Sequence, residues 1–329
     1  MLPPEGGTLR RRKGFSTIDA LLLLMALIWG TNYSIVKSAF LDIDPQAFNA
    51  VRMVIGSAIF LVVILVTRRT RATWPAARQA HGPESTDMAS IWHTPAPITS
   101  RDWLGLLALG IVGHASYQYL FVGGLALTTV ASSSLILAAT PVVIAIVSAM
   151  LGQERIGPLH WVGAALSLTG IYIVVGRGMA LGGASVRGDI MMFGAVCCWA
   201  IYTLGARQLM VRHSPVGVTG LSLAIGTAMY VPLVWPHLRA TDWSAVNTGT
   251  WMALLYSSLF ALCVAYTIWY VAVRTIGNAR TSVYSNLIPI IAMLTAVVFL
   301  GEQFTLTKIA GAAAVLTGVA LTRVGKAKE

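Results

Sequence analysis

Charged side chains are scarce in this sequence of 329 residues. They make up 11% of the chain, against about 25% in a typical soluble domain, whereas hydrophobic residues make up 56%. So little charge excludes a soluble globular protein of ordinary composition. The apolar residues fall into blocks of about 17 to 25, the length of a helix that crosses a bilayer, and polar breaks separate them. The sequence therefore predicts an all-α integral membrane protein.

Cysteine and acidic residues are also rare. Cys197, Cys198 and Cys263 lie in apolar stretches without CxxC spacing or a neighbouring histidine, so we expect no disulfide, no metal and no cofactor. Only 12 acidic residues oppose 23 basic ones, which leaves a net charge of +11. The basic residues lie at the ends of apolar blocks and not in an aromatic-interleaved patch, so we do not expect nucleic acid as a partner.

Ten segments are predicted to cross the membrane as helices. They are residues 20–40, 48–66, 103–124, 129–152, 159–175, 190–209, 216–234, 251–273, 283–300 and 305–321. The long run 103–152 is divided at Gly123, Gly124 and the stretch ending at Thr129, because it exceeds one crossing. Residues 67–101 are polar and rich in Pro, Ala, Arg and His, so we expect a long, mobile cytoplasmic loop.

The basic residues sort to one side of this topology. With the amino terminus inside, the only basic residues expected outside are Arg177, Arg187, Arg239 and Lys308. Lys37 and Arg52 lie within helices, and all other basic residues fall inside. This positive-inside pattern predicts that both terminal tails, residues 1–17 and 325–329, are cytoplasmic.

An internal repeat organises the chain. Four residues recur after 148 positions: Pro141 as Pro289, Glu154 as Glu302, Gly163 as Gly311 and Gly170 as Gly318. Asp19 and Trp29 recur after 170 positions as Asp189 and Trp199, and this offset differs because the first half carries the longer loop. The pattern predicts two five-helix units, residues 18–176 and 186–324. Because five is odd, the second unit is expected to be inverted, with a solute site between the halves.

Two units of this kind, each with a proline-containing helix, a Gly-(x)-Glu and a glycine-rich helix, resemble the EamA-type drug/metabolite transporter superfamily. The resemblance covers nearly the whole chain and depends on Trp29–Tyr33, Pro45–Arg52, Pro141 with Glu154, and Pro289 with Glu302. It implies a multi-pass permease of the bacterial inner (cell) membrane that exports small metabolites such as amino acids. The 67–101 loop is longer than is usual in the family, and Ser222 stands where the repeat would place a partner for Arg52.

Candidate solute-binding residues are those predicted at mid-bilayer depth. Trp29 and Asn32 lie as deep from one side as Trp199 and Tyr202 do from the other, and His114 lies at the midplane. Tyr266 and Trp269 form an aromatic face on the eighth helix, and Ser282 and Asn286 supply polar groups on the ninth. Helix packing explains such residues equally well, so both interpretations stay open.

Five further residues are predicted to have structural or gating roles. Arg52 lies inside the second helix, where its charge needs a partner or water, so anion capture and structural pairing both remain open. Pro141 and Pro289 are expected to bend their helices, and Glu154 and Glu302 to cap or pair with the ends of neighbouring helices.

These features predict a carrier that is not an enzyme, with a small-molecule solute and the lipid bilayer as partners and a homodimer left open. A membrane-embedded enzyme is the alternative, but the six histidines are scattered and no GxSxG, HExxH or P-loop pattern occurs. A receptor or scaffold that uses the 67–101 loop is a third hypothesis, and the inverted repeat argues against it.

Overall fold

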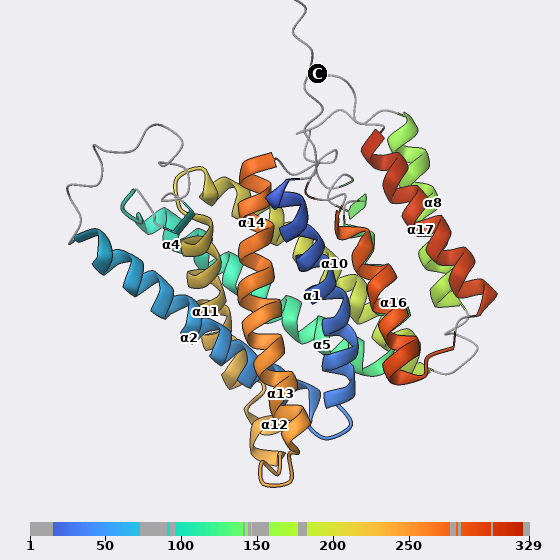
Figure 1. The fold of residues 1–329 in the computed structure, drawn as a ribbon, viewed down its shortest axis with the longest axis horizontal. Helices are drawn as coiled ribbons and strands as arrows, with labels where there is room; N and C mark the ends of the chain where they lie inside the picture. Colours follow the sequence, from blue (N-terminus) through green and yellow to red (C-terminus); the bar gives the residue numbers. More distant parts are fainter. Residues whose placement is uncertain are drawn as a thin grey trace, which may run out of the picture.

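The computed structural model describes residues 16–72, 91–92, 96–140, 142–143, 146, 158–176, 183–276, 281, 284–303 and 305–324, and all its elements there are helical (Figure 1). In chain order they are α1 (Thr17–Ala39), α2 (Pro45–Ala72), α4 (Ser100–Leu109), η2 (Gly110–Ser116), α5 (Tyr117–Leu127), α6 (Val130–Ala138), α8 (Pro158–Gly176), α10 (Gly183–Met210), α11 (Pro215–Leu233), α12 (Trp235–Ala240), α13 (Thr248–Tyr256), η3 (Ser257–Val264), α14 (Ala265–Ile276), α16 (Leu287–Leu300) and α17 (Leu306–Val324).

Six helical stretches of the described chain are long and apolar enough to cross a membrane. They are Thr17–Ala39, Pro45–Arg68, Ser100–Leu127, Ser185–Met210, Pro215–Leu233 and Thr248–Val273. Shorter apolar helices cover Trp161–Ile173, Leu287–Leu300 and Leu306–Leu321. The protein is therefore an all-helical, multi-pass membrane protein. Ten crossings remain a prediction, because most of the segment after Thr140 in the fourth expected helix lies outside the described residues.

Some expected helix boundaries were wrong. Gly123 and Gly124 do not end a helix, because α5 continues through them to Leu127. They allow close packing instead: a Cβ at either position would collide with α10, at Met191 or at the Gly188 carbonyl. The break comes at Thr128 and Thr129, inside the stretch where it was expected, and Thr129 caps α6. The second helix does not end at Val66 either but runs to Ala72, into the segment expected to be a loop. Residues 73–90 and 93–95 of that loop lie outside the described residues.

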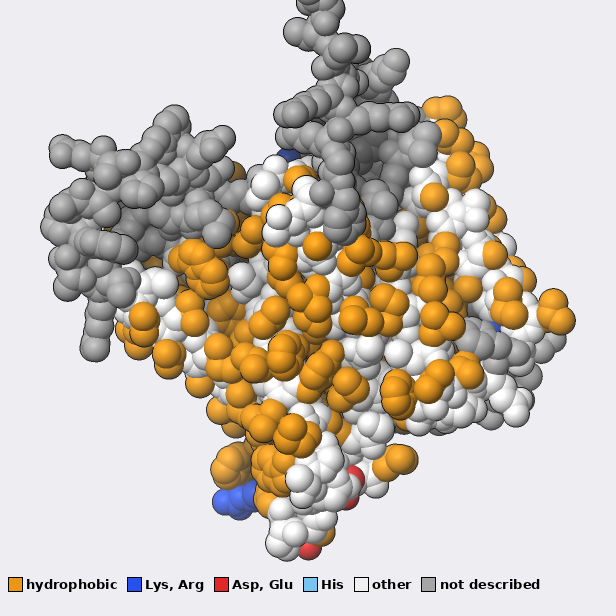
Figure 2. Space-filling view, in the orientation of Figure 1, with side chains coloured by type: hydrophobic (Ala, Val, Ile, Leu, Met, Phe, Trp, Pro, Cys, Tyr) orange, Lys and Arg blue, Asp and Glu red, His pale blue; other side chains and the backbone are white. Residues whose placement is uncertain are grey.

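The outer surface carries the apolar side chains that a membrane protein presents to lipid. Large exposed hydrophobic residues include Leu27 on α1, Leu65 on α2, Leu255 on α13 and Phe299 on α16. Figure 2 shows such side chains across the middle of the face, with charged groups at its lower tip. A contiguous apolar surface of this kind is typical of contact with hydrocarbon and not with water.

Local sequence signals start several of these helices. Ser16 and Asp19 form a capping box at the start of α1, and Thr99 and Asp102 form another at the start of α4. Pro45 and Pro215 each occupy the first turn of a helix, where the missing N–H has no cost. These two prolines are 170 residues apart, the same offset that relates Trp29 to Trp199.

Both offsets reappear in the packing. Gly56 of α2 faces Leu262 of η3, and 170 residues later Gly226 of α11 faces His114 of η2. His114 and Leu262 are themselves 148 residues apart. The two π-helical segments, η2 and η3, also nearly superimpose on the 148-residue offset. Residues related by the two sequence offsets therefore lie in corresponding contacts.

The equivalent helices α1 and α10 run in opposite directions. Lys37, near the end of α1, donates to the carbonyl oxygen of Thr128, and the hydroxyl of the same threonine donates to Asp189 near the start of α10 (2.7 Å). Asp19, at the other end of α1, accepts instead from the Tyr284 hydroxyl (2.8 Å). The end of α1 thus lies near the start of α10, so the two helices are antiparallel, as expected for an inverted repeat.

Helices α8 and α17 lie side by side at one edge of the molecule, away from α2 (Figure 1). Glycines allow their close approach: a Cβ on Gly170 would lie 2.7 Å from the Val315 nitrogen, and one on Gly318 would lie 2.5 Å from the Ser167 nitrogen. Small residues at such crossings are typical of membrane helices, which associate through close van der Waals packing.

Candidate solute site

An array of aromatic rings joins the two halves at the centre of the bundle. The Trp29 ring lies 5.5 Å from that of Tyr266 and 5.9 Å from that of Trp269. The Trp199 ring lies 5.4 Å from Tyr202 and 5.6 Å from Tyr266. Tyr266 therefore contacts both tryptophans. Five of the predicted site residues, which come from α1, α10 and α14, are brought together here.

Tyr117 of α5 completes this array, and sequence reasoning missed it. Its ring lies 5.3 Å from Trp199 and stacks on Phe121 at 5.7 Å. Tyr33 extends the array one turn further along α1 and contacts Phe121 edge-on at 5.5 Å. We call Trp29, Tyr33, Tyr117, Phe121, Trp199, Tyr202, Tyr266 and Trp269 the aromatic array. The spacing of Tyr117 and Phe121 by one helical turn was the available signal.

The π-helical segments help to position the array. In η3, the carbonyl oxygen of Ala261 accepts a hydrogen bond of 3.0 Å from the indole Nε1 of Trp29. A π-helix shifts the normal hydrogen-bond ladder by one residue and often occurs at functional sites. The indole of Trp29 is thus held in one orientation, in which it makes a T-shaped contact with Tyr266.

His114 lies in the other π segment, η2, and is 1% exposed. Its Nε2 is 3.2 Å from the Ser222 hydroxyl, and its ring is 5.0 Å from that of Tyr202. Its Nδ1 has no hydrogen-bond partner among the described residues. His114 therefore borders the array through Tyr202, and it is held by Ser222, the residue that the repeat aligns with Arg52.

Arg52 is buried at 2% exposure and joins three helices. Its Nη1 donates to the Ser257 hydroxyl at 3.1 Å, and its Nη2 donates to the side-chain oxygen of Gln118. Gln118 follows Tyr117 on α5, and the guanidinium interacts electrostatically with Tyr117 and Tyr266, two members of the aromatic array. Sequence reasoning did not single out Gln118 or Ser257. Gln118 lies 148 positions before Tyr266, a predicted site residue, so the repeat could have indicated Gln118 as a site residue too.

The remaining candidate residues are distributed around this centre. Asn32 is buried, and its Oδ1 accepts no hydrogen bond from the described residues. Asn286 lies at the turn before α16. Pro289 follows that turn, and the clash of its ring with the carbonyl four residues earlier explains why the helix is interrupted there. Pro141, Glu154 and Ser282 lie outside the described residues.

Charged side chains bind the helix ends on either side of the α5–α6 turn, residues 128–129. Glu302 accepts from the backbone N–H groups of Val130 and Ala131 at 2.7 and 3.3 Å, at the start of α6. Lys37 donates to the carbonyl oxygens of Leu125 and Ala126 at the end of α5, at 2.7 and 3.2 Å. Each charge faces the helix end whose dipole it complements.

Polar contacts also join the α1–α2 turn to α12 and α13, at the bottom of Figure 1. Asp42 accepts from the backbone N–H of Asn247 at 2.9 Å, and this bond lowers the pKa of that carboxyl. His237 lies 3.0 Å from Asp44, and Tyr230 donates to Gln46. These contacts link the α1–α2 turn and the start of α2 to α11, α12 and the residue before α13.

Long apolar helices that surround buried aromatic and polar groups define a multi-pass membrane protein. The profile of the EamA-like transporter family matches residues 16–79, 88–176 and 186–324. The chain belongs to that family.

Curated relatives are similar over nearly their whole length. The uncharacterized transporter YyaM of Bacillus subtilis is 21% identical over 305 residues, which cover 92% of each chain. An uncharacterized transporter of Archaeoglobus fulgidus is 23% identical over 310 residues, or 93% of this chain and 97% of the relative. One crystal structure, described only as that of a protein, shares the fold with a TM-score of 0.61 at 19% identity, and covers 96% of this chain and 100% of that chain.

Proposed function

We propose that the protein is a secondary transporter that exports small organic solutes, such as amino acids, by alternating access. In this proposal the chain crosses a bacterial inner membrane ten times as two inverted five-helix halves, with both termini in the cytoplasm. The solute binds at the aromatic array, and one half rocks against the other to expose it to either side. The protein carries no covalent chemistry, so it is not an enzyme.

The observation that carries this proposal is the origin of the aromatic array in both halves. Trp29 and Trp199 are equivalent by the 170-residue offset, and both contact Tyr266. When the two halves move against each other, a site built on equivalent residues of antiparallel helices opens to the opposite side of the membrane. The residues of the site stay together during this movement. The polar contacts around the α5–α6 turn and Asp42 then belong to a state closed to the outside.

Counterflow into liposomes tests this function directly. Purified protein is expected to exchange at least one labelled solute from a panel of amino acids, nucleosides and organic cations, faster than protein-free vesicles. Heat-inactivated protein in the same vesicles is the control. Binding of a solute without any exchange would favour a receptor over a carrier.

The inverted topology predicts that two equivalent surface positions label from opposite sides. Leu41 follows α1 and is 90% exposed, and Val211, 170 residues later, follows α10 and is 83% exposed. In a background without Cys197, Cys198 and Cys263, an impermeant maleimide is expected to label Leu41→Cys in intact cells and Val211→Cys only after lysis. Labelling of both from the same side would overturn the inverted arrangement.

A further inference from the structure

Among the described residues, Arg52 has only neutral hydrogen-bond partners. Its two terminal nitrogens donate to Ser257 and Gln118, and its Nε has no hydrogen-bond partner in the described part of the chain. Its electrostatic neighbours are the tyrosines Tyr266, Tyr117 and Tyr230. A buried cation that keeps its charge without a counter-ion is costly, since neutral groups replace only part of its hydration.

No described carboxylate supplies the missing counter-charge. Each has partners elsewhere: Asp19 with Tyr284, Asp42 with Asn247, Asp44 with His237, Asp102 with Arg212, Asp189 with Thr128, Asp242 with Ser244, and Glu302 with Val130 and Ala131. The other acidic residues, Glu5, Glu84, Asp87, Glu154 and Glu329, lie outside the described residues and in predicted tails or polar connections. The positive charge at the centre of the bundle is therefore uncompensated by any acid that the structure describes.

The surroundings of Arg52 define what would compensate it. The guanidinium interacts electrostatically with Tyr266 and Tyr117, and both of these rings contact Trp199, so Arg52 borders the aromatic array. A carboxylate accepts the fork of an arginine through short, charge-assisted hydrogen bonds. An organic cation gains from ring faces but is repelled by the buried charge beside them. The geometry thus favours a solute with a carboxylate and an apolar or aromatic body.

We propose that Arg52 binds the carboxylate of the transported solute while the aromatic array holds its apolar part. The protein then carries carboxylates, including amino acids with apolar side chains, in preference to amines and amides of the same shape. This inference rests on the proposed function, because it names the solute class for the same site. In the absence of solute, Gln118 and Ser257 hold the guanidinium in place.

Three solutes with one ring and one chain length test the solute class: 3-phenylpropionate, 3-phenylpropionamide and phenethylamine. Each competes in counterflow, and each is titrated in a thermal-unfolding assay of the purified protein. The wild type is expected to prefer the carboxylate over the amide at least about tenfold, the size of one charge-assisted hydrogen bond. An amide or amine that competes as well as the acid would overturn the proposal, even while transport itself continues.

Substitutions then assign the preference to Arg52. Arg52→Gln is expected to remove the acid-to-amide preference, whereas Arg52→Lys keeps the charge and is expected to retain part of it. Arg239→Gln makes the same change over Trp235 at the surface and is expected to keep the full preference. The ratio of two solutes does not depend on the amount of folded protein, so it separates binding from scaffolding. An unchanged acid-to-amide ratio in Arg52→Gln contradicts the proposal. If that variant does not fold, Arg52→Lys takes its place: a ratio below that of the wild type supports the proposal, and an unchanged ratio contradicts it.

Loss of all protein-dependent exchange in the wild type is a different outcome. It would contradict the transporter function itself, together with any solute class. Exchange of amines and amides but not acids would leave the transporter function standing and remove only the role of Arg52 as a carboxylate site.

Discussion

Gly226→Ala is expected to lower the thermal stability of the protein clearly, although alanine is the better helix former. The new Cβ would lie 2.5 Å from the His114 Cβ and 2.6 Å from the Gly110 carbonyl oxygen. Neither atom is the end of a flexible side chain, so α11 must move away from η2. Overpacking of this kind costs about 1 to 3 kcal/mol. The gain in helix propensity, at most about 1 kcal/mol, does not offset it.

The equivalent residue in the other half is the control. In Gly56→Ala the new Cβ would meet the Leu262 Cδ1 at 3.1 Å, the end of a side chain that can turn aside. Its unfolding temperature in detergent is therefore expected to stay within a degree or two, roughly the effect of a few tenths of a kcal/mol. Equal losses in both variants would show that the close contact at His114 does not limit the stability of the bundle.

Trp199→Ala is expected to weaken transport more than any other single change in the aromatic array. Trp199 contacts Tyr117, Tyr202 and Tyr266, so its removal opens the centre of the array. One aromatic contact to a bound solute contributes about 0.5 to 1.5 kcal/mol beyond its area, so the apparent affinity should fall about threefold to tenfold or more. Trp29→Ala is expected to act in the same direction, because Trp29 also contacts Tyr266.

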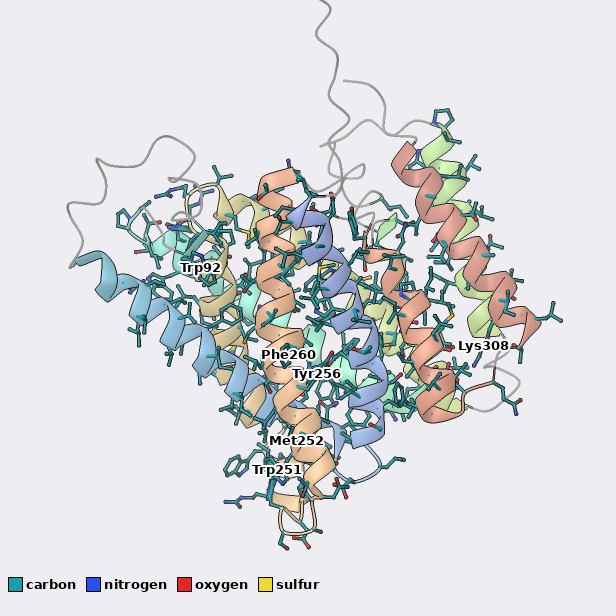
Figure 3. All side chains as sticks on the ribbon, in the orientation of Figure 1. Trp92, Trp251, Met252, Tyr256, Phe260 and Lys308 are labelled. Atoms are coloured by element: carbon teal, nitrogen blue, oxygen red, sulfur yellow. The ribbon has the colours of Figure 1, made fainter. Side chains whose placement is uncertain are left out.

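The measurement is the concentration dependence of counterflow at matched amounts of reconstituted protein. Trp251→Ala is the control, since Trp251 is 39% exposed at the surface of α13, far along the helix from the array (Figure 3). It is expected to leave the apparent affinity unchanged. If Trp29→Ala and Trp199→Ala both kept the wild-type affinity while Tyr266 or Trp269 variants lost it, the solute would bind nearer the Ile276 end of α14.

The sequence predicts how deep Trp29 and Trp199 lie in the membrane, but not which neighbouring helices their side chains contact. Counting residues from the helix ends places Trp29 and Trp199 near the same level from opposite sides. Which neighbours their rings meet depends on helix rotation and crossing, which the apolar pattern leaves open because both lipid-facing and buried positions are apolar. The contacts with Tyr266, and the part played by Tyr117 and Gln118, therefore required the structure.

The lengths and apolar character of the helices, the scarcity of charge and the two repeat offsets are properties of the sequence itself, because lipid demands long apolar segments and duplication preserves spacing. These determined the all-helical membrane class and the resemblance to the family. The tertiary structure alone decided that the two π segments correspond and that α1 and α10 meet at Thr128. It also decided that Arg52 faces the aromatic array without an acidic partner among the described residues. The physical reason is that side-chain contacts between distant helices depend on the packing of the whole bundle, which no local pattern encodes.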